Sequence, residues 1–192
     1  MKTFKAALMP GFKMLMVMTV ICGFAYTLLV TGIAQLFFPE EANGSIVTVA
    51  LAEGGEKQIG SKLIGQGFTE PKYLLGRPNT GASASQLSPV SSEQKELVLE
   101  RIANLEKIDP MNKAEIPMEL VTASGSGVDP EISLATALYQ VGRIANERGI
   151  SEKEVEKVIK NNTIGTIFGK IGEPRVNVLG VNMQLDGLKI AK

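Results

Sequence analysis

The stretch MLMVMTVICGFAYTLLVTGIAQLFF, residues 14–38, decides the architecture of this chain of 192 residues. It holds no charged side chain. As an α-helix it would be about 37 Å long, enough to cross the ~30 Å hydrocarbon layer of a membrane with some tilt. A cleaved signal peptide would have an apolar core of about 7–15 residues followed by small side chains. This run is longer and ends in bulky side chains, so it predicts a retained transmembrane helix.

The charges beside this span predict its orientation. The basic side chains before it are Lys2, Lys5 and Lys13, and the acidic ones directly after it are Glu40 and Glu41. Lysines and arginines close to a span stay on the cytoplasmic side of the membrane. We therefore expect residues 1–13 in the cytoplasm and residues 39–192 outside it, in a single-pass protein.

Small side chains within the span could let a second helix approach closely. They are Thr19, Gly23, Thr27, Thr31 and Gly32. Glycine and threonine are also common in membrane helices in general, so two interpretations stay open: a helix-packing face, or ordinary membrane composition.

Composition argues against an enzyme. The 20 basic and 20 acidic residues balance, which gives no indication of nucleic-acid binding. Histidine is absent and Cys22 is the single cysteine, so the commonest general base, the commonest metal ligand and an intramolecular disulfide are all excluded. We expect no catalytic residue and no metal site.

Residues 39–192 are long enough for one domain with its own core. Its expected elements are a strand at 45–51, an extended stretch at 57–66, a surface loop at 69–90, a helix from Ser91 to Asp109, further helices at 130–148 and 151–160, and a bulged strand at 175–185. In the first long helix Val98, Ile102 and Leu105 should form the buried stripe. Strands at both ends with helices between them predict an α+β domain behind a single transmembrane helix.

The segment VTASGSGVDPEISLATALYQVGRIANERG, residues 121–149, contains the candidate site residues. Asp129 is expected to cap its helix, Pro130 to occupy the first turn and Gly149 to end it. The expected buried face is Leu134, Leu138, Val141 and Ala145. That leaves Tyr139, Gln140 and Arg143 free to meet a partner or a ligand, although a solvated helix face is an equally good interpretation.

Two sharper interpretations of the same segment are weaker. Ser124 and Ser126 could be nucleophiles, but there is no histidine to activate them and the G-x-S-x-G pattern fails at Ser124. The Gly/Ser loop could also cradle a phosphate. However, both common glycine-rich phosphate motifs are missing, and the carboxylate of Asp129 would repel an anion.

Motifs along nearly the whole chain carry a family resemblance. They are FPEEANGS after the span, GSKLIGQGF at 60–68, YLLGRP at 73–78, PMELVTASGSGVDPEISLATALYQVGRIA at 117–145, SEKEV at 151–155 and GEPRVNVLGVNMQL at 172–185. In this order they resemble the C subunit of the bacterial Kdp potassium-transporting P-type ATPase, the KdpC family.

This resemblance implies a non-catalytic accessory subunit of an inner-membrane complex that imports K⁺ by ATP hydrolysis. The implied partners are a channel-like potassium-binding subunit and a catalytic subunit that is phosphorylated and hydrolyses ATP. The family's C subunit is described as a chaperone that raises the catalytic subunit's affinity for ATP, through a glutamine matched here by Gln140. No cofactor of its own is implied.

Two alternatives remain beside that chaperone role. The expected topology places Gln140 outside the membrane, away from cytoplasmic ATP, and this favours a purely structural cap on the outer side of the channel-like subunit. A more remote alternative is an independent membrane-anchored binding module.

Overall fold

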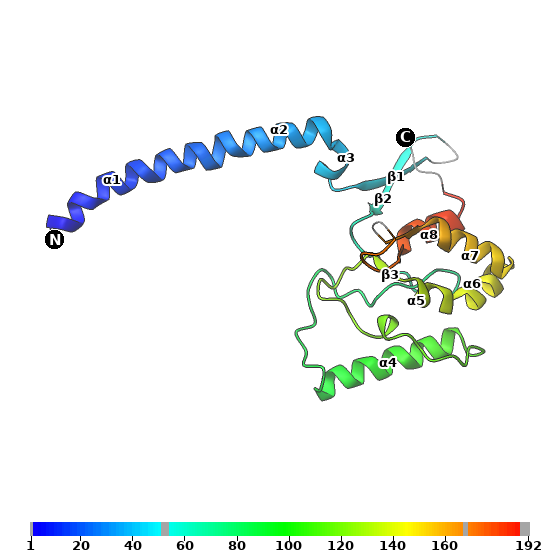
Figure 1. Cartoon of the computed structure of the whole chain (residues 1–192). Helices are drawn as coiled ribbons and strands as arrows, with labels where there is room; N and C mark the ends of the chain where they lie inside the picture. Colours follow the sequence, from blue (N-terminus) through cyan, green and yellow to red (C-terminus); the bar gives the residue numbers. More distant parts are fainter. Residues whose placement is uncertain (1, 51–53, 167–168, 189–192) are drawn as a thin grey trace. The chain divides into compact units, whose positions relative to one another are not determined.

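A computed structural model describes residues 2–50, 54–166 and 169–188. The chain divides into two units, Met1–Ser45 and Ile46–Lys192, and Figure 1 shows a long N-terminal helix and a separate domain of helices and short strands. The predicted class, one N-terminal apolar helix followed by an α+β domain, is confirmed. The predicted domain boundaries at residues 13 and 38 stay a prediction.

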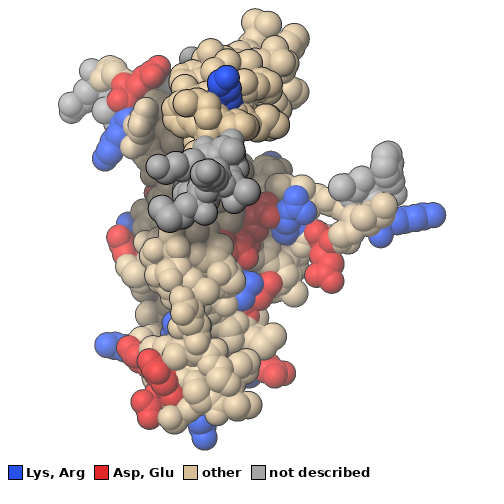
Figure 2. All heavy atoms as spheres, turned by 90° about the vertical axis from the view of Figure 1, so that its left-hand side faces the viewer, with Lys and Arg blue, Asp and Glu red and all other residues tan. Residues whose placement is uncertain are grey.

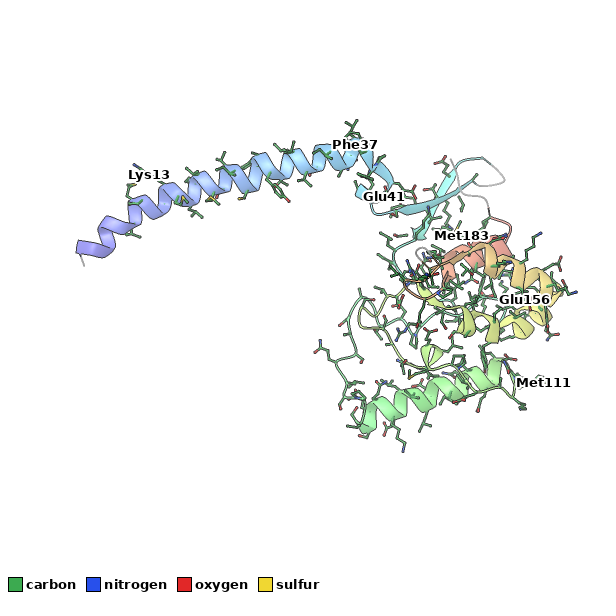
Figure 3. All side chains as sticks on the ribbon, viewed as in Figure 1. Lys13, Phe37, Glu41, Met111, Glu156 and Met183 are labelled. Atoms are coloured by element: carbon green, nitrogen blue, oxygen red, sulfur yellow. The ribbon has the colours of Figure 1, made fainter. Side chains whose placement is uncertain are left out.

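The N-terminal unit is a helix in consecutive segments. They are α1 (Lys2–Met18), the π-helix η1 (Thr19–Tyr26), α2 (Thr27–Phe37) and the short α3 (Pro39–Ala42). Among the described residues, Leu8–Phe37 is the one helix long and apolar enough to cross a membrane. Figure 3 shows side chains projecting from this helix between Lys13 and Phe37.

The π-helical segment contains part of the predicted small-residue face. Thr27 Oγ1 donates to the carbonyl of Cys22, five residues back, at 3.0 Å, and π-helical turns widen a helix locally. A Cβ added at Gly23 would lie 3.7 Å from the Thr19 methyl. Thr19 and Gly23 therefore share one face, and helix packing against it stays a prediction.

The domain begins with an antiparallel hairpin of β1 (Ile46–Ala50) and β2 (Glu56–Ser61). The predicted strand at 45–51 is confirmed over residues 46–50, and the predicted extended stretch at 57–66 forms a strand over residues 57–61. Leu51 lies outside the described residues. The register shifts between Val47 and Thr48, which marks a bulge. Val47 and Val49 are buried against Leu179 and Met183 in a small core, and the label on Met183 in Figure 3 marks its place near this hairpin.

The main core lies between a second sheet and four helices. The sheet has the order β3–β5–β4 and is antiparallel throughout, with β3 (Glu131–Ser133), β4 (Thr163–Ile164) and β5 (Arg175–Asn177). The helices are α5 (Leu134–Tyr139), α6 (Val141–Arg148), α7 (Glu152–Asn161) and α8 (Val178–Leu185). Ile132, Ile144, Ile159 and Val176, which together span this sheet and helices, are almost completely buried.

The expected helix over 130–148 is only partly correct. Residues Glu131–Ser133 pair instead with β5, and Asp129 accepts a hydrogen bond from Glu131 N at 3.0 Å, so Asp129 as the helix cap is wrong. The cap is Ser133, whose hydroxyl accepts from Thr136 N. The helix is also divided at Gln140, whereas its predicted end is confirmed by the left-handed Gly149 (φ 63°).

The predicted strand at 175–185 is wrong beyond residue 177. Asn177 accepts from Gly180 N and caps α8. Val178 and Val181 of this helix pack into the main core, while Leu179 and Met183 pack against the hairpin. Because α8 is buried on two faces, its apolar residues follow neither the strand period nor a single helical stripe.

The remaining predicted elements agree more closely. Helix α4 (Ser92–Ile108) is capped by Ser91, which accepts from Gln94 N, and α7 begins with the predicted Ser151–Glu154 capping box. The 3-10 turn η2 (Met118–Leu120) follows α4. The expected buried stripe of α4 is wrong, however, because none of its residues is buried. Leu138, also expected in the core, is 45% exposed.

Candidate functional site

Gln140 lies at the junction of α5 and α6 and is 1% exposed. Its Oε1 accepts hydrogen bonds from Leu75 N at 2.9 Å and from Arg143 Nη2 at 2.7 Å. Its Nε2 donates to the carbonyl oxygens of Leu75 at 3.0 Å and Thr136 at 3.3 Å. A side-chain amide offers two donors and two acceptor lone pairs, so the hydrogen-bonding capacity of Gln140 is fully used within the domain.

Arg143 continues this network one turn along α6. Its Nη1 donates to the carbonyls of Pro71 and Tyr73, the latter at 3.1 Å. Burial lowers the pKa of Arg143, yet a guanidinium stays protonated in a protein. Its buried charge is therefore met by backbone carbonyl dipoles and by Gln140, and no ion pair joins it to a carboxylate within the described ranges.

Two further side chains bind the same stretch of backbone. Asn182 of α8 accepts from Leu74 N at 2.8 Å and donates to Leu74 O at 2.9 Å. Arg148 donates to the carbonyl of Lys72 at 2.7 Å and pairs with Asp186 at 2.7 Å.

Together these contacts define what we term the clasped segment, residues 71–75. Each of its residues has a backbone group bound by a side chain from α6, α8 or the α5–α6 junction. Every buried side-chain polar atom in the described part of the chain has a partner. Surface loops are usually mobile, but here buried amides and guanidinium groups fix one to the helices.

Tyr73 strengthens this attachment at the domain surface. Its hydroxyl donates to Asp186 at 3.0 Å, and its ring lies 5.2 Å from the Arg148 guanidinium and 5.3 Å from the Phe68 ring. Burial, followed by the hydrogen bond and charge of Asp186, raises the pKa of Tyr73. The tyrosine therefore stays neutral at physiological pH and holds the segment from the outside.

The structure joins two of the predicted site residues by a hydrogen bond and leaves the third outside that network. Gln140 and Arg143 are in direct contact, but both are buried, so the expectation that they are free to meet a partner or a ligand is wrong for the chain on its own. Tyr139 is half-buried next to the end of α4, and its carbonyl accepts from Asn112 at 3.2 Å. Burial raises the pKa of Tyr139. Nucleotide binding by Gln140 stays a prediction.

The Ser/Gly loop serves as a turn in this structure. The hydroxyls of Ser124 and Ser126 lie 3.3 Å apart and accept from the backbone N–H groups of Gly127 and Val128. A side chain at Gly127 (φ 73°) would collide with Thr80 Oγ1 at 2.1 Å, because the 69–90 loop passes directly over it. Among the described residues no group of three or more His, Cys, Asp or Glu is placed to hold a metal ion.

Asn182, Arg148 and the clasped segment were not predicted from the sequence. An asparagine inside the apolar run VLGVNMQL was the one available signal, since a polar side chain in a core must find hydrogen-bond partners. The backbone groups of the clasped segment that these side chains bind are more than 70 residues away from Arg148 and Asn182 in sequence.

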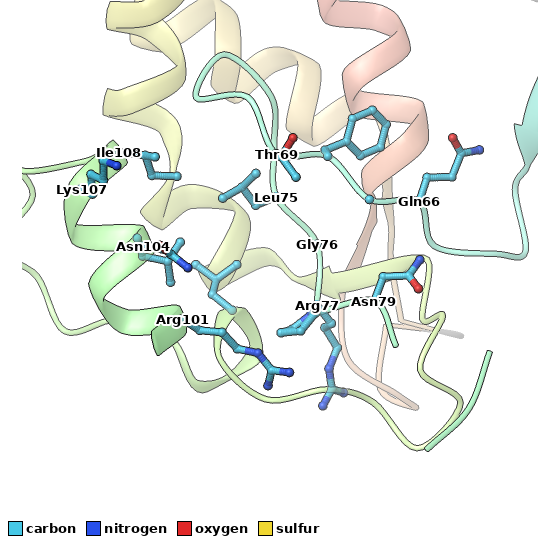
Figure 4. Close-up of a pocket in the computed structure, with 15 residues that line it drawn as sticks. Gln66, Thr69, Leu75, Gly76, Arg77, Asn79, Arg101, Asn104, Lys107 and Ile108 are labelled. Carbon is cyan, nitrogen blue, oxygen red and sulfur yellow. The ribbon is translucent and has the colours of Figure 1, made fainter. Parts of the chain in front are cut away.

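A cavity of about 590 Å³ lies between the chain that follows the clasped segment and helix α4. Figure 4 shows Arg77 and Arg101 extending in the same direction at one end of it, with Leu75 and Ile108 at the other. Arg77 donates to the carbonyl of Ala123 at 3.0 Å and lies 3.6 Å from Asp129.

On the face of the domain that Figure 2 shows, acidic and basic side chains are interspersed. This agrees with the net charge of zero. No patch of one sign marks this face as a binding surface for nucleic acid.

Comparison with known proteins decides the family. The model of the family "K+-transporting ATPase, c chain" matches residues 8–187. This chain belongs to the KdpC family. A protein of Listeria monocytogenes named "Potassium-transporting ATPase KdpC subunit" is 50% identical over 99% of this chain and 100% of its own length. Proteins of the same name from Methylococcus capsulatus and Clostridium botulinum are 45% and 42% identical, over 94% and 98% of this chain and 97% and 99% of their own lengths.

Membership of the KdpC family confirms the resemblance found in the sequence. It makes the chain an accessory subunit of a potassium-transporting ATPase with one candidate transmembrane helix. Because the matched region spans both the apolar helix and the domain, the clasped segment lies within the part of the chain that the family shares.

Proposed function

We propose that this chain is a non-catalytic assembly subunit, anchored by its N-terminal helix, whose domain acts as an extracytoplasmic cap on the channel-like subunit of the complex. The observation that carries the proposal is the burial and the complete hydrogen bonding of the Gln140 side chain. This glutamine is buried and all four of its hydrogen-bonding positions are filled by groups of its own chain. Such a residue organises the domain and has no capacity left for a nucleotide.

The absence of catalytic groups supports the same proposal. Histidine is absent from the sequence, and the hydroxyls of Ser124 and Ser126 accept hydrogen bonds from backbone N–H groups in a turn. ATP hydrolysis and ion selection then belong to the other subunits, the catalytic P-type subunit and the channel-like one. Potassium is the ion that the complex transports, and this subunit needs no cofactor.

The chaperone role described for the family is the second candidate. It would have the domain raise the ATP affinity of the catalytic subunit, with Gln140 as the contact. That role requires either a cytoplasmic domain or an indirect effect through the assembly, so the location of the domain separates the two candidates.

Thiol labelling of intact spheroplasts tests on which side of the membrane the domain lies. In a Cys22→Ala background, Ser92→Cys places a thiol at the exposed start of α4, and Lys5→Cys places one before the span as a matched control. We expect an impermeant reagent to label Ser92→Cys in intact spheroplasts and Lys5→Cys only after the membrane is broken. The reverse pattern would contradict the extracytoplasmic cap, because the N-terminal lysines would then lie outside.

A truncation tests the assembly role separately. A chain ending at residue 45 keeps the apolar helix and lacks the domain. If the domain is a cap, this chain should insert in the membrane, but the purified complex should lose stability and potassium uptake. Full uptake by cells that contain only the truncated chain would contradict the proposal.

A further inference from the structure

The cavity beside the clasped segment has the size and lining of a ligand site. Its volume of about 590 Å³ lies within the ~300–1,000 Å³ typical of small-molecule pockets. The apolar part of its lining is Phe68, Leu75, Pro78, Leu105, Ile108 and Leu120.

The charges around this cavity all have one sign. Arg77, Arg101 and Lys107 line it, and no aspartate or glutamate does. Arg101 uses Nη1 to donate to Val121 O at 2.8 Å, and its other N–H groups have no partner among the described residues. Lys107 makes no ion pair within the same ranges. Arg77 is partly neutralised by Asp129, so the uncompensated charge comes from α4.

The packing of α4 leaves this space open. The helix has 17 residues, none of them buried, although Leu105 and Ile108 face the cavity. Arg101 comes from the same helix, so α4 contributes both part of the apolar wall and the open positive charge beside Arg77. Lys107 lies beside Ile108 at the other end of the cavity. An apolar surface beside unpaired cations fits a molecule that is apolar in one part and anionic in another.

We propose that this cavity binds an anionic amphiphile, with a phosphate or carboxylate at Arg101, beside Arg77, and an apolar portion against Leu75, Leu105 and Ile108. Charge-assisted hydrogen bonds hold such an anion. The same chemistry could come from an acidic phospholipid or from a soluble anion. Residues 38–45 separate the membrane-suited helix from the domain, and about eight residues span at most ~29 Å, which keeps the domain near lipid and favours the phospholipid.

Binding is measured by titration calorimetry on the full chain in phosphatidylcholine nanodiscs, with empty nanodiscs as the blank. The probes are short-chain phosphatidylglycerol, short-chain phosphatidylcholine and inorganic phosphate. Arg101→Gln removes the open charge at the end of the cavity where Arg77 and Arg101 lie. Gly67→Leu adds volume at a lining position whose Cβ would meet nothing within 4 Å. Lys95→Gln, on α4 but outside the cavity lining, is the matched control.

We expect phosphatidylglycerol to bind the wild-type chain more tightly than either other probe. Arg101→Gln loses one charge-assisted contact and should weaken this binding about tenfold, equivalent to ~1.4 kcal/mol. Gly67→Leu should weaken it by occlusion without changing charge, and Lys95→Gln should leave it unchanged.

Several results would overturn the proposal. Equal binding of phosphatidylcholine removes the role of the anion, and equal binding of inorganic phosphate removes the role of the apolar wall. Unchanged affinity in both cavity variants, or equal losses in Lys95→Gln, places binding elsewhere. No binding of any probe ends it. The readout is binding to the isolated chain, so failure here is distinct from failure of the assembly role.

Discussion

Replacing Gln140 with alanine separates a structural glutamine from one that serves a nucleotide. The change removes the partner of Leu75 N and Leu75 O and one partner of Arg143. A buried polar group left without a hydrogen bond costs about 1–3 kcal/mol. Leu75 itself is half-buried, so water would compensate in part. We expect the free energy of unfolding to fall by about 3–5 kcal/mol, a large share of the ~5–15 kcal/mol that stabilises a typical domain.

Urea unfolding of the full chain in micelles, followed by circular dichroism, measures this loss, because the chain has no tryptophan for fluorescence. Gln184→Ala is the matched control. Gln184 is an exposed glutamine of α8 whose side chain accepts one solvent-exposed hydrogen bond, from Asn162 at 2.9 Å, and surface changes usually alter stability by less than ~0.5 kcal/mol. Gln140→Glu provides a second comparison, since it keeps the acceptor for Arg143 and loses the donor to Leu75 O.

The refuting result is defined by two measurements on the same variant. If Gln140→Ala unfolds like the wild type and the assembled complex shows a several-fold increase in its KM for ATP, Gln140 serves the nucleotide and the structural argument is wrong. If stability falls and the KM of whatever complex still assembles is unchanged, the assembly role is supported.

Three other predictions follow from the helices and from one carboxylate. Changing Gly23 and Gly32 to leucine should weaken co-purification with the other subunits, because a second helix could no longer approach closely; an unchanged yield of complex would exclude this packing face. Ser133→Ala should cost about 1–3 kcal/mol, because it loses both the α5 cap and the hydrogen bond from the Ser133 hydroxyl to Glu119; the loss is measured by urea unfolding against Ser92→Ala, whose side chain caps nothing in the described structure. Burial works to raise the pKa of Glu119, but hydrogen bonds from Thr136 and Ser133 and the charge of Arg77 outweigh it, so that its pKa lies below its ordinary value. A lowered folded-state pKa gives stability that is complete above the unfolded pKa and is lost as the pH falls through the folded one. The melting temperature of Glu119→Gln should therefore depend less on pH in this acidic range than that of the wild type, and identical pH profiles would contradict the assignment.

Local sequence signals were sufficient where an element is determined by its own residues. The uncharged run at 14–38 predicted the apolar helix, because only length and the absence of charge are needed to suit a membrane. The capping interactions at Ser91 and Ser151 and the left-handed Gly149 were also predicted correctly. In each case the determining contacts lie within about one helical turn.

Elements that depend on distant partners could not be predicted in this way. Asp129 and Pro130 satisfy every local rule for a helix start, yet Glu131–Ser133 pair with β5 and Ser133 becomes the cap. Helix α8 was mistaken for a strand because two separate cores bury two of its faces, which removes the single apolar stripe that periodicity detects.

The candidate site also has features that the sequence determines by itself and features that depend on tertiary contacts. By itself the sequence determined the membrane helix, the α+β class, the family and the absence of histidine chemistry, since each depends on composition or on continuous motifs. Only the tertiary structure decided that Gln140 and Arg143 are buried, because their partners at residues 71–75 lie about 65–70 positions away. A polar residue on a helix is free or fully occupied according to what packs on it, and that is a property of the folded chain.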